Sequence, residues 1–371
     1  MRRLIFSLLP LICVLASPCA RADATASPQP AASPQAAAES QAAASPGAAP
    51  GQQRSRVYYG SDTELMDGIN PNGEAVEAQT DALVMAVTGQ KSIAAAWRTL
   101  VAPTDHVGIK ISAAGGRNLS THPQIVAAVL RGLAAAGVPM SQVVIWDRTD
   151  PASAGYHYGP GGPGVRGIEP FSGYESKSAV TISTIGRLIW GDASFQLRRA
   201  DPLEPLEPEQ FSAESHWSKL LCGLDKVINI PVMTTSEDCG MAGCIYNMTV
   251  PNLDNWRRFI DEPDCGDPYL AELFSDSHVG PKVVLNLMDG LVAQYGGGPE
   301  WQPHYSWNCD TIYAGKDAVA IDATALRVLD ACRKEARLPL VTPRAKYLET
   351  AAEMGLGNYQ ADQIDLVQTA R

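Results

Sequence analysis

The sequence has few basic residues, and this shortage limits what the protein can bind. Lysine and arginine together number 29, against 40 aspartates and glutamates, so the formal net charge is −11 at pH 7. An acidic chain is repelled by the phosphate backbone of nucleic acids. We therefore expect no nucleic-acid partner, and we expect a small-molecule ligand instead.

The sequence also lacks the short motifs by which many enzymes are identified. Its six histidines show neither HxH nor HExxH spacing, and no CxxC pair occurs. The glycine-rich runs at 159–164 and 296–299 are not followed by a helix at the spacing of a nucleotide-binding loop, and no serine nucleophile elbow is present. We therefore expect no dedicated metal site, and the sequence defines neither a cofactor nor an oligomeric state.

An apolar stretch long enough to cross a bilayer is absent, but a shorter one opens the chain. Arg2 and Arg3 precede an apolar run over 4–16, and the small residues of ARA at 20–22 follow. This order is typical of a secretory signal peptide, whereas a membrane span needs about 20 apolar residues. We predict a signal peptide over 1–22, export to the periplasm or the exterior, and no membrane span. Cleavage would remove three arginines and no acid, which changes the charge from −11 to −14.

Large apolar side chains are scarce in the next segment. Residues 23–55 are almost wholly Ala, Ser, Pro, Gln and Gly. Such a composition cannot bury enough apolar surface to offset the entropy lost on ordering. We therefore predict a disordered linker over 23–55. Residues 56–371 contain no second segment of this kind, so we expect one domain there.

Apolar segments of strand length alternate with helical patterns in this domain. Strands are expected at 105–111, 143–146, 177–185, 226–230, 283–288, 311–314 and 364–367. Helices are expected at 121–136, 212–222, 252–260, 268–274, 318–332 and 344–354, and loops at 150–170, 232–250 and 295–310. Thr121 should cap the first helix and Asp317 the fifth. The order predicts an α/β fold with a mostly parallel sheet, helices on both faces and long inserted loops.

Polar residues stand where several of the expected strands end. In open α/β sheets, ligands bind beyond the carboxyl ends of the strands, and Lys110, Asp147, Asp289 and the 232–250 loop fall there. Lys110 interrupts an apolar stretch, where an ammonium group loses hydration unless it meets an anion. We predict that Lys110 binds a substrate anion and that Asp289 or Asp322 acts as acid or base. The alternative is that Lys110 pairs with an acid of the fold and that Asp322 complements a helix dipole.

Two cysteines in the 232–250 loop have three interpretations. Cys239 and Cys244 are separated by glycines that let the backbone turn sharply. A local disulfide comes first because the chain is expected to be exported. A metal pair comes second, without supporting histidines. A thiolate nucleophile comes third, because no adjacent histidine would activate it.

Aromatic residues are scarce, at 7% of the chain, yet several gather in one loop. His304 lies among Trp301, Tyr305 and Trp307. This cluster would suit a stacking platform for a ring-shaped ligand such as a sugar, and it would equally suit a packed loop.

Several segments together resemble a family known only as domain of unknown function 362. They are VGIKISAAG at 107–115, THPQIVAAVLRGLAAAGV at 121–138, VVIWD at 143–147, LDKVINIPV at 224–232, AGCIYNM at 242–248, VVLNLMDGLVAQYGGGP at 283–299, AGKDAVAIDATALRVL at 314–329 and YLETAAEMGLG at 347–357. The order of the segments carries the resemblance, which spans roughly 105–367. The segment at 121–138 is also similar to part of the nickel-pincer lactate racemases, an analogy of fold alone.

The resemblance implies an α/β fold and a set of matching polar residues. The residues that match are Lys110, Asn229, Asn247, Asp289, Gly290, Asp317 and Asp322. Family members often carry ferredoxin-type clusters, but this chain has no such cysteine run. The family also shows Lys-x-His after the strand at 226–230 and a lysine before Asn247, where this chain has Thr234-Thr235-Ser236 and Tyr246.

These observations lead to one predicted site and three hypotheses of function. Asp147, Asn229, Asn247 and His122 are predicted to bind substrate beside the catalytic candidates Lys110, Asp289 and Asp322. The first hypothesis is an exported enzyme acting on a small anionic or polyhydroxylated molecule. The others are a non-catalytic envelope binding protein and a redox or metal protein that uses Cys239 and Cys244.

Overall fold

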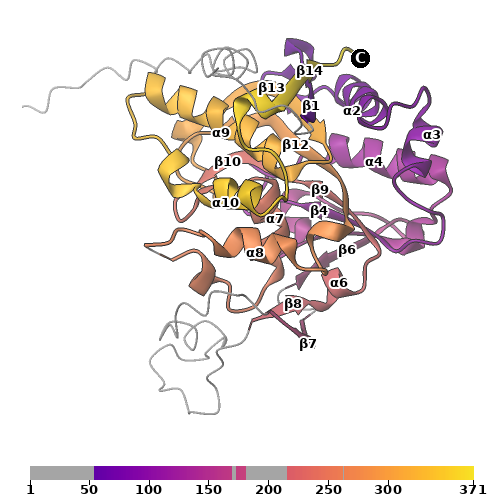
Figure 1. Cartoon of the computed structure of the whole chain (residues 1–371). Coiled ribbons are helices and arrows are strands. Elements are labelled where there is room, and N and C mark those ends of the chain that lie inside the picture. The colour runs from indigo at the N-terminus through magenta and orange to yellow at the C-terminus, as the bar shows by residue number, and fades with distance from the viewer. Residues whose placement is uncertain (1–53, 169–172, 181–214, 262) are drawn as a thin grey trace, which may run out of the picture.

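The computed structural model describes residues 54–168, 173–180, 215–261 and 263–371 (Figure 1). The predicted signal peptide and nearly all of the predicted linker lie outside these residues. Strand β1 (Ser55–Ser61) begins at the last residue assigned to the linker.

One large sheet organises the described residues. Its order is β14 (Ile364–Gln368), β1, β13 (Ser306–Gly315), β12 (Val283–Gln294), β9 (Lys226–Ile230), β4 (Val107–Ile111), β5 (Val143–Asp147) and β6 (Gly164–Gly167). In addition, β10 (Val232–Ser236) pairs with β12, and β11 (Gly240–Met241) pairs with β10. Among the pairs, β13 runs antiparallel to both β1 and β12, and β11 runs antiparallel to β10, whereas the others are parallel. The predicted α/β fold with a mostly parallel sheet is confirmed.

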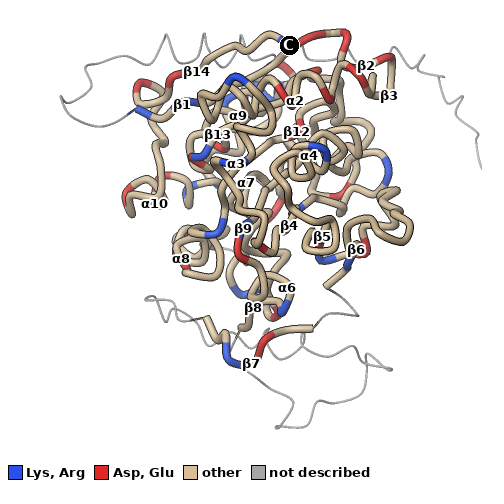
Figure 2. The backbone as a smooth tube through the Cα atoms, turned by 90° about the vertical axis from the view of Figure 1, so that its right-hand side faces the viewer, with Lys and Arg blue, Asp and Glu red and all other residues tan. Residues whose placement is uncertain are grey.

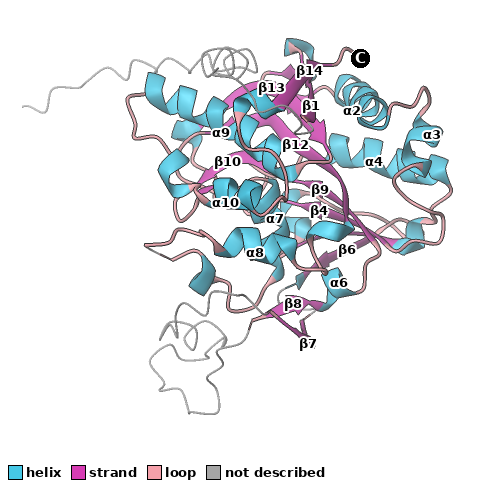
Figure 3. Ribbon diagram, in the orientation of Figure 1, coloured by secondary structure: helices cyan, strands magenta, loops and turns pink. Residues whose placement is uncertain are grey.

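Helices cover both faces of this sheet (Figures 1 and 3). One face carries α2 (Gly73–Thr88), α3 (Ile93–Arg98) and α4 (Pro123–Ala136), and the other carries α7 (Cys244–Thr249), α8 (Tyr269–Ser275), α9 (Ala318–Glu335) and α10 (Tyr347–Glu353). Successive side chains of a strand point to opposite faces of the sheet, so the strands contribute apolar residues to both cores. Ile109 and Ile111 pack in the core with α2 and α4, while Val227 packs in the core with α7 and α9. None of the helices described combines the length and the apolar composition that crossing a membrane requires.

Smaller elements complete the described chain. Two short hairpin-like sheets pair β2 (Met66–Asp67) with β3 (Asn70–Pro71), and β7 (Tyr174–Ala179) with β8 (His216–Ser218). Helix α6 (Lys219–Cys222) follows β8. The strand predicted at 177–185 is thus β7 up to Ala179; Val180 lies beyond the end of this strand, and 181–185 lie outside the described residues.

The start of α4 differs from the prediction. His122, not Thr121, is the N-cap residue, and no side chain caps this helix. The Thr121 hydroxyl donates instead to the Ile230 carbonyl at 2.6 Å and accepts from the Ser112 backbone N–H at 2.9 Å. Thr121 therefore ties α4 to the ends of β4 and β9, a tertiary role that competes with local capping.

The prediction of a polar loop over 232–250 is wrong. The segment contains β10, β11 and α7, and 241–250 are all buried. Its hydroxyl groups find partners inside the fold; for example, Thr235 donates to the Gly297 carbonyl at 3.2 Å. Polar side chains with internal hydrogen bonds can be buried at little cost, so their polarity did not indicate exposure. The helix predicted at 252–260 is likewise wrong, because only short 3-10 turns occur at Val250–Asn252 and Arg257–Phe259.

Candidate functional site

The ammonium group of Lys110 lies inside the protein with every donor in use. It donates to the Asp147 carboxylate at 2.6 Å, to Asn247 Oδ1 at 3.0 Å and to the Ile111 carbonyl at 2.7 Å. The side chain is 0% exposed. Burial lowers the pKa of Lys110, and the charge of Asp147 opposes this effect. Because an ammonium group has three donors, Lys110 has none left for a ligand in this arrangement.

A row of asparagines continues this network across the sheet. Asn247 donates to Asn229 at 2.8 Å, and Asn229 donates to Asn286 at 2.8 Å. Lys110 pairs in register with Asn229, which pairs in register with Asn286, so the three side chains share one face. Sequence reasoning missed Asn286, although an amide inside the apolar run VVLNL was the signal. The row fastens α7 to β4, β9 and β12.

Asp322 holds the other end of α7. Its carboxylate accepts from the backbone N–H groups of Cys244 at 2.6 Å and Ile245 at 3.0 Å. Gly243 makes this approach possible, since a Cβ there would lie 2.2 Å from Asp322 Oδ1. Burial raises the pKa of Asp322 to about 7, against the lowering effect of these hydrogen bonds. Asp322 thus acts as a cap supplied to α7 by α9.

Asp289 and His122 form a separate pair on the opposite face. Asp289 Oδ2 accepts from the His122 backbone N–H at 2.7 Å and lies 2.8 Å from its Nδ1. Asp289 also accepts from the Leu291 N–H at 3.1 Å. Burial lowers the pKa of His122, but the charge and hydrogen bond of Asp289 outweigh it, and the net shift is upward. Since His122 begins α4, this pair belongs to the layer of α2 and α4, whereas Lys110 faces α7.

The structure therefore divides the predicted site residues into two groups. Lys110, Asp147, Asn229 and Asn247 meet, while Asp289 and His122 lie across the sheet. The three catalytic candidates Lys110, Asp289 and Asp322 are each 0% exposed. None of these three residues lines the clefts described below, so their catalytic roles stay predictions. The contacts that they make in the structure connect helices and strands of the fold to one another.

The predicted disulfide between Cys239 and Cys244 is not formed. Both are buried thiols that form no disulfide, and so is Cys309. The Cys239 thiol contacts Ser236 Oγ at 3.4 Å. Burial raises the pKa of Cys239 to about 12 and raises that of Cys244 well above its usual value. High pKa values disfavour the thiolate that a nucleophile or a metal ligand requires. In the described residues, no three His, Cys, Asp or Glu side chains group as a metal site would need.

A cleft of about 630 Å³ opens at the carboxyl ends of β10 and β12. It is lined by Thr235, Ser236, Glu237, Asp238, Ile260, Asp261, Gly296, Gly297, Tyr305, Arg333, Leu338, Val341 and Arg344. Gly298 lets the loop after β12 approach β10, because a Cβ there would lie 2.3 Å from the Thr235 carbonyl. This position is where open α/β sheets bind ligands.

An aromatic ring forms part of this cleft. Tyr305 lines it and packs edge-on against Tyr295, with 5.6 Å between ring centroids. Tyr295 packs in turn against Trp307 at 5.7 Å, and His304 packs edge-on against Tyr305 at 5.6 Å. Trp301 is 40% exposed. The cluster read from the sequence thus forms around Tyr305 and includes Tyr295, which sequence reasoning missed.

Charged groups of both signs border the cleft. Arg333 donates to the carbonyls of Pro339 at 2.5 Å and Tyr295 at 2.6 Å, and Arg344 donates to the Glu237 carbonyl at 3.0 Å. Loss of hydration, followed by the charge of Asp261, raises the pKa of Asp238. Neither arginine was predicted from the sequence. Arg333 lies near the end of a helix and Arg344 lies in a turn, and no local pattern indicates that the two line one cleft. In Figure 2 the blue Lys and Arg positions are scattered over many elements.

The fold and the sequence together define the family. The family model described as Domain of unknown function (DUF362) matches residues 107–327, and the chain belongs to this family. The match covers β4 to most of α9, which includes the Lys110 network, but it ends before Arg333 and Arg344. No curated protein and no solved structure gives a significant match to this chain.

Proposed function

We propose that this chain is an exported enzyme that acts on a small polyhydroxylated molecule bound in the cleft at the carboxyl ends of β10 and β12. The observation that carries the proposal is the meeting of an aromatic ring, Tyr305, with carboxylates and hydroxyl groups in one cleft. Aromatic faces pack against the apolar faces of sugar-like rings, and carboxylates accept hydrogen bonds from their hydroxyls.

The charge of the lining favours a polyhydroxylated ligand over a strongly anionic one. Two arginines and three carboxylates, those of Glu237, Asp238 and Asp261, line the same cleft. Three of the arginine donors are already bound to backbone carbonyls, at Pro339, Tyr295 and Glu237. Such a lining offers acceptors for many hydroxyl groups and no excess of positive charge for an anion.

Asp238 is the side chain best suited to acid–base chemistry in this cleft. Its pKa is raised, so it holds a proton to higher pH than an ordinary aspartate does, as a general acid requires. We assign a positioning role to Lys110, Asn247 and Asp322. Their contacts hold α7 in place, and α7 directly follows β10 and β11 in the chain. These residues therefore help to hold the cleft residues at the end of β10. Asp289 is assigned the same kind of role for the start of α4.

Calorimetric titration with a panel of neutral sugars, polyols and sugar acids tests binding. We expect saturable binding of a neutral member and a loss of about tenfold in affinity for Tyr305→Ala, the effect of removing one stacked ring. Tyr158→Ala removes a tyrosine that is 38% exposed and lies outside this cleft, and serves as the control. Failure of every neutral member to bind, or equal binding by Tyr305→Ala, would overturn the proposal.

Product analysis of each binder separates an enzyme from a binding protein. We expect conversion by the parent protein, and binding without conversion by Asp238→Asn, which keeps the shape of the side chain and removes its acid. If the parent binds the ligand and leaves it unchanged, the alternative of a non-catalytic binding protein replaces the enzyme.

Export is tested separately on protein made from the full chain. The mature protein should be recovered outside the cytoplasm with an N-terminus at residue 23, because 1–22 has the pattern of a signal peptide. A cytoplasmic protein that retains residue 1 would contradict this part of the proposal.

A further inference from the structure

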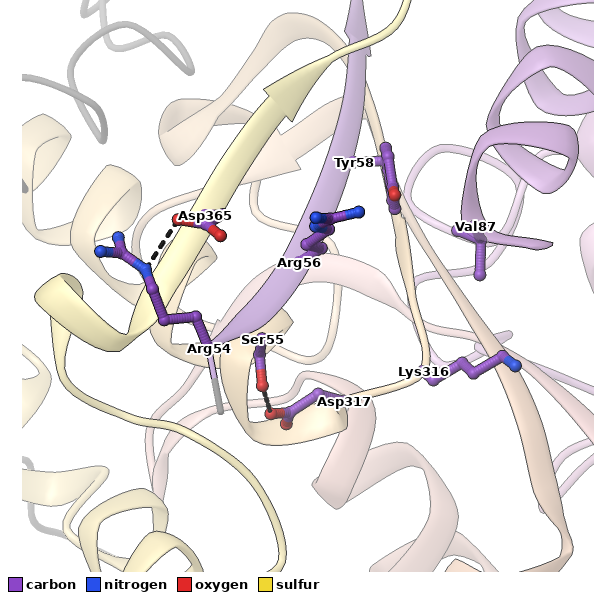
Figure 4. A pocket seen from close by; sticks show the side chains of 8 residues that line it. All are labelled: Arg54, Ser55, Arg56, Tyr58, Val87, Lys316, Asp317 and Asp365. Atoms are coloured by element: carbon purple, nitrogen blue, oxygen red, sulfur yellow. Dashed lines mark hydrogen bonds and ion pairs between the residues drawn. The ribbon is translucent and has the colours of Figure 1, made fainter. Parts of the chain in front are cut away.

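A second cleft, of about 820 Å³, lies at the opposite rim of the sheet (Figure 4). It is lined by Arg54, Ser55, Arg56, Tyr58, Val87, Lys316, Asp317 and Asp365. These residues come from the start of β1, the end of α2, the turn between β13 and α9, and the start of β14. Because β13 runs antiparallel to β12, this rim is the one at which β12 begins, away from the cleft of the proposed function.

Two exposed cations, Arg56 and Lys316, line this cleft, and neither has an acidic partner among the described residues. The antiparallel β1–β13 ladder ends at the pair Tyr58–Ala314, and Arg56 and Lys316 each lie two residues beyond this pair. The strands remain close there, since a Cβ on Gly315 would lie 3.2 Å from the Arg56 carbonyl. Among the described residues, neither Arg56 nor Lys316 has a carboxylate within 4.0 Å. Two cations that line one cleft repel each other, and solvent and salt screen this repulsion between exposed side chains.

The acids of the same cleft are already engaged. Asp365 forms an ion pair with Arg54 at 2.7 Å. Asp317 accepts from Ser55 Oγ at 2.5 Å, from the Ala320 N–H at 2.9 Å and from the Asn358 N–H at 2.8 Å. Figure 4 shows the Asp317 carboxylate turned toward Ser55, whereas the side chains of Arg56 and Lys316 extend to the other side, near Tyr58 and Val87.

An uncompensated cationic pair is notable in a protein with a net charge of −11. Carboxylates outnumber cations in the chain, yet in the part that the structure describes none lies within 4.0 Å of Arg56 or Lys316. A bound anion would attract both cations and offset the repulsion between them.

We propose that Arg56 and Lys316 bind the phosphate group of a small soluble molecule, with the Tyr58 hydroxyl as a further donor. A phosphate carries more than one negative charge and several acceptor oxygens near neutral pH, which matches two cations on one side of a cleft. Arginine supplies a planar pair of donors to two oxygens, and lysine supplies a compact charge. Val87 adds an apolar side chain to the lining of the cleft, against which the part of the ligand other than the phosphate can pack.

The site is independent of the proposed function, because the two clefts share no residue and lie at opposite rims of the sheet. Loss of binding at one would leave binding at the other unchanged.

Calorimetric titration of the full-length mature protein with inorganic phosphate, at constant ionic strength, tests the proposal. We expect one saturable site, and we expect Arg56→Gln and Lys316→Gln each to weaken it by about tenfold, the effect of losing one charge-assisted contact. Lys91→Gln makes the same change of charge at an exposed position outside the cleft and should bind as the parent does.

The variants should also change stability in the absence of ligand. Arg56→Gln removes a repulsion and should raise the thermal midpoint of the phosphate-free protein or leave it unchanged, and phosphate should raise the midpoint of the parent more than that of the variant. Absence of saturable phosphate binding in the parent, or equal weakening by Lys91→Gln, would overturn the proposal.

Discussion

The carboxylate of Asp322 and the backbone N–H of Cys244 form a 2.6 Å hydrogen bond that joins α9 to the first residue of α7. The two residues are 78 positions apart in the chain. Helix α7 therefore receives its N-terminal cap from another helix. On its other side the same helix is held by Asn247, which accepts from Lys110. The position of the segment from β10 to α7, and with it one wall of the cleft at β10, depends on these two contacts.

The first prediction concerns pH and Asp322. Its pKa is raised from 3.8 to about 7 in the folded state, so the folded state binds this proton more tightly than the unfolded state does. The contribution of Asp322 to the free energy of unfolding should be greatest below about pH 4. It should fall as pH rises to about 7, by up to about 4 kcal/mol. Asp322→Asn does not titrate, so urea unfolding across this range should show a weaker decline than in the parent. Parallel declines in both proteins would contradict the raised pKa.

The second prediction concerns the buried pair of Lys110 and Asp147. Lys110→Met should reduce the free energy of unfolding by about 3–5 kcal/mol, because it leaves the Asp147 carboxylate buried without its cation. The double variant Lys110→Met with Asp147→Asn should lose less than the single variant. Chemical denaturation measures both, with Lys91→Met, an exposed lysine, as the control. A single variant as stable as the control would show that the pair is not needed for folding.

The third prediction concerns His122 and Asp289. The pKa of His122 is raised above 6.5 because Asp289 outweighs the effect of burial. Stability from this pair should be fully present below about pH 6.5 and should be lost as pH rises through the folded-state pKa. In Asp289→Asn the burial remains and the charge is gone, so the pKa should fall below that of the parent. An NMR titration of the imidazole resonances measures the shift, and an upward or absent shift in the variant would refute the assignment.

The fourth prediction concerns Cys239 and Cys244. Both thiols are free and buried, and burial raises the pKa of each. Alkylation should therefore be slow in the folded protein and complete after unfolding without reductant. Mass spectrometry of the two digests reports the outcome. A peptide pair linked by a Cys239–Cys244 bridge would instead restore the disulfide predicted from the sequence.

Local signals in the sequence were sufficient for much of the sheet and its helices. The strand at 226–230 was predicted residue for residue, and Asp317 caps α9 as expected, with its carboxylate accepting from Ala320 N–H. Both features are encoded within a few neighbouring residues: an apolar run in one case, and a capping side chain before a helical pattern in the other.

Features that depend on tertiary contacts were not accessible in this way. The sequence did not predict on which face of the sheet Asp289 lies. The strand was expected to end at 288, but β12 continues to Gln294, so Asp289 lies inside a strand rather than beyond its end. The segment from β10 to α7 reads as polar, and only the partners of its hydroxyls and amides explain its burial. The charged groups of the cleft come from loops and helix ends far apart in the chain, and no local pattern marks Arg333 or Arg344 as neighbours of Tyr305.

A crystal structure of the protein grown with the tightest-binding polyhydroxylated ligand from the panel shows where the ligand binds. We expect the ligand to lie in the cleft at the ends of β10 and β12, with its ring against Tyr305 and a hydroxyl within hydrogen-bond distance of Asp238. A ligand bound elsewhere on the protein, with this cleft unchanged, would contradict this expectation.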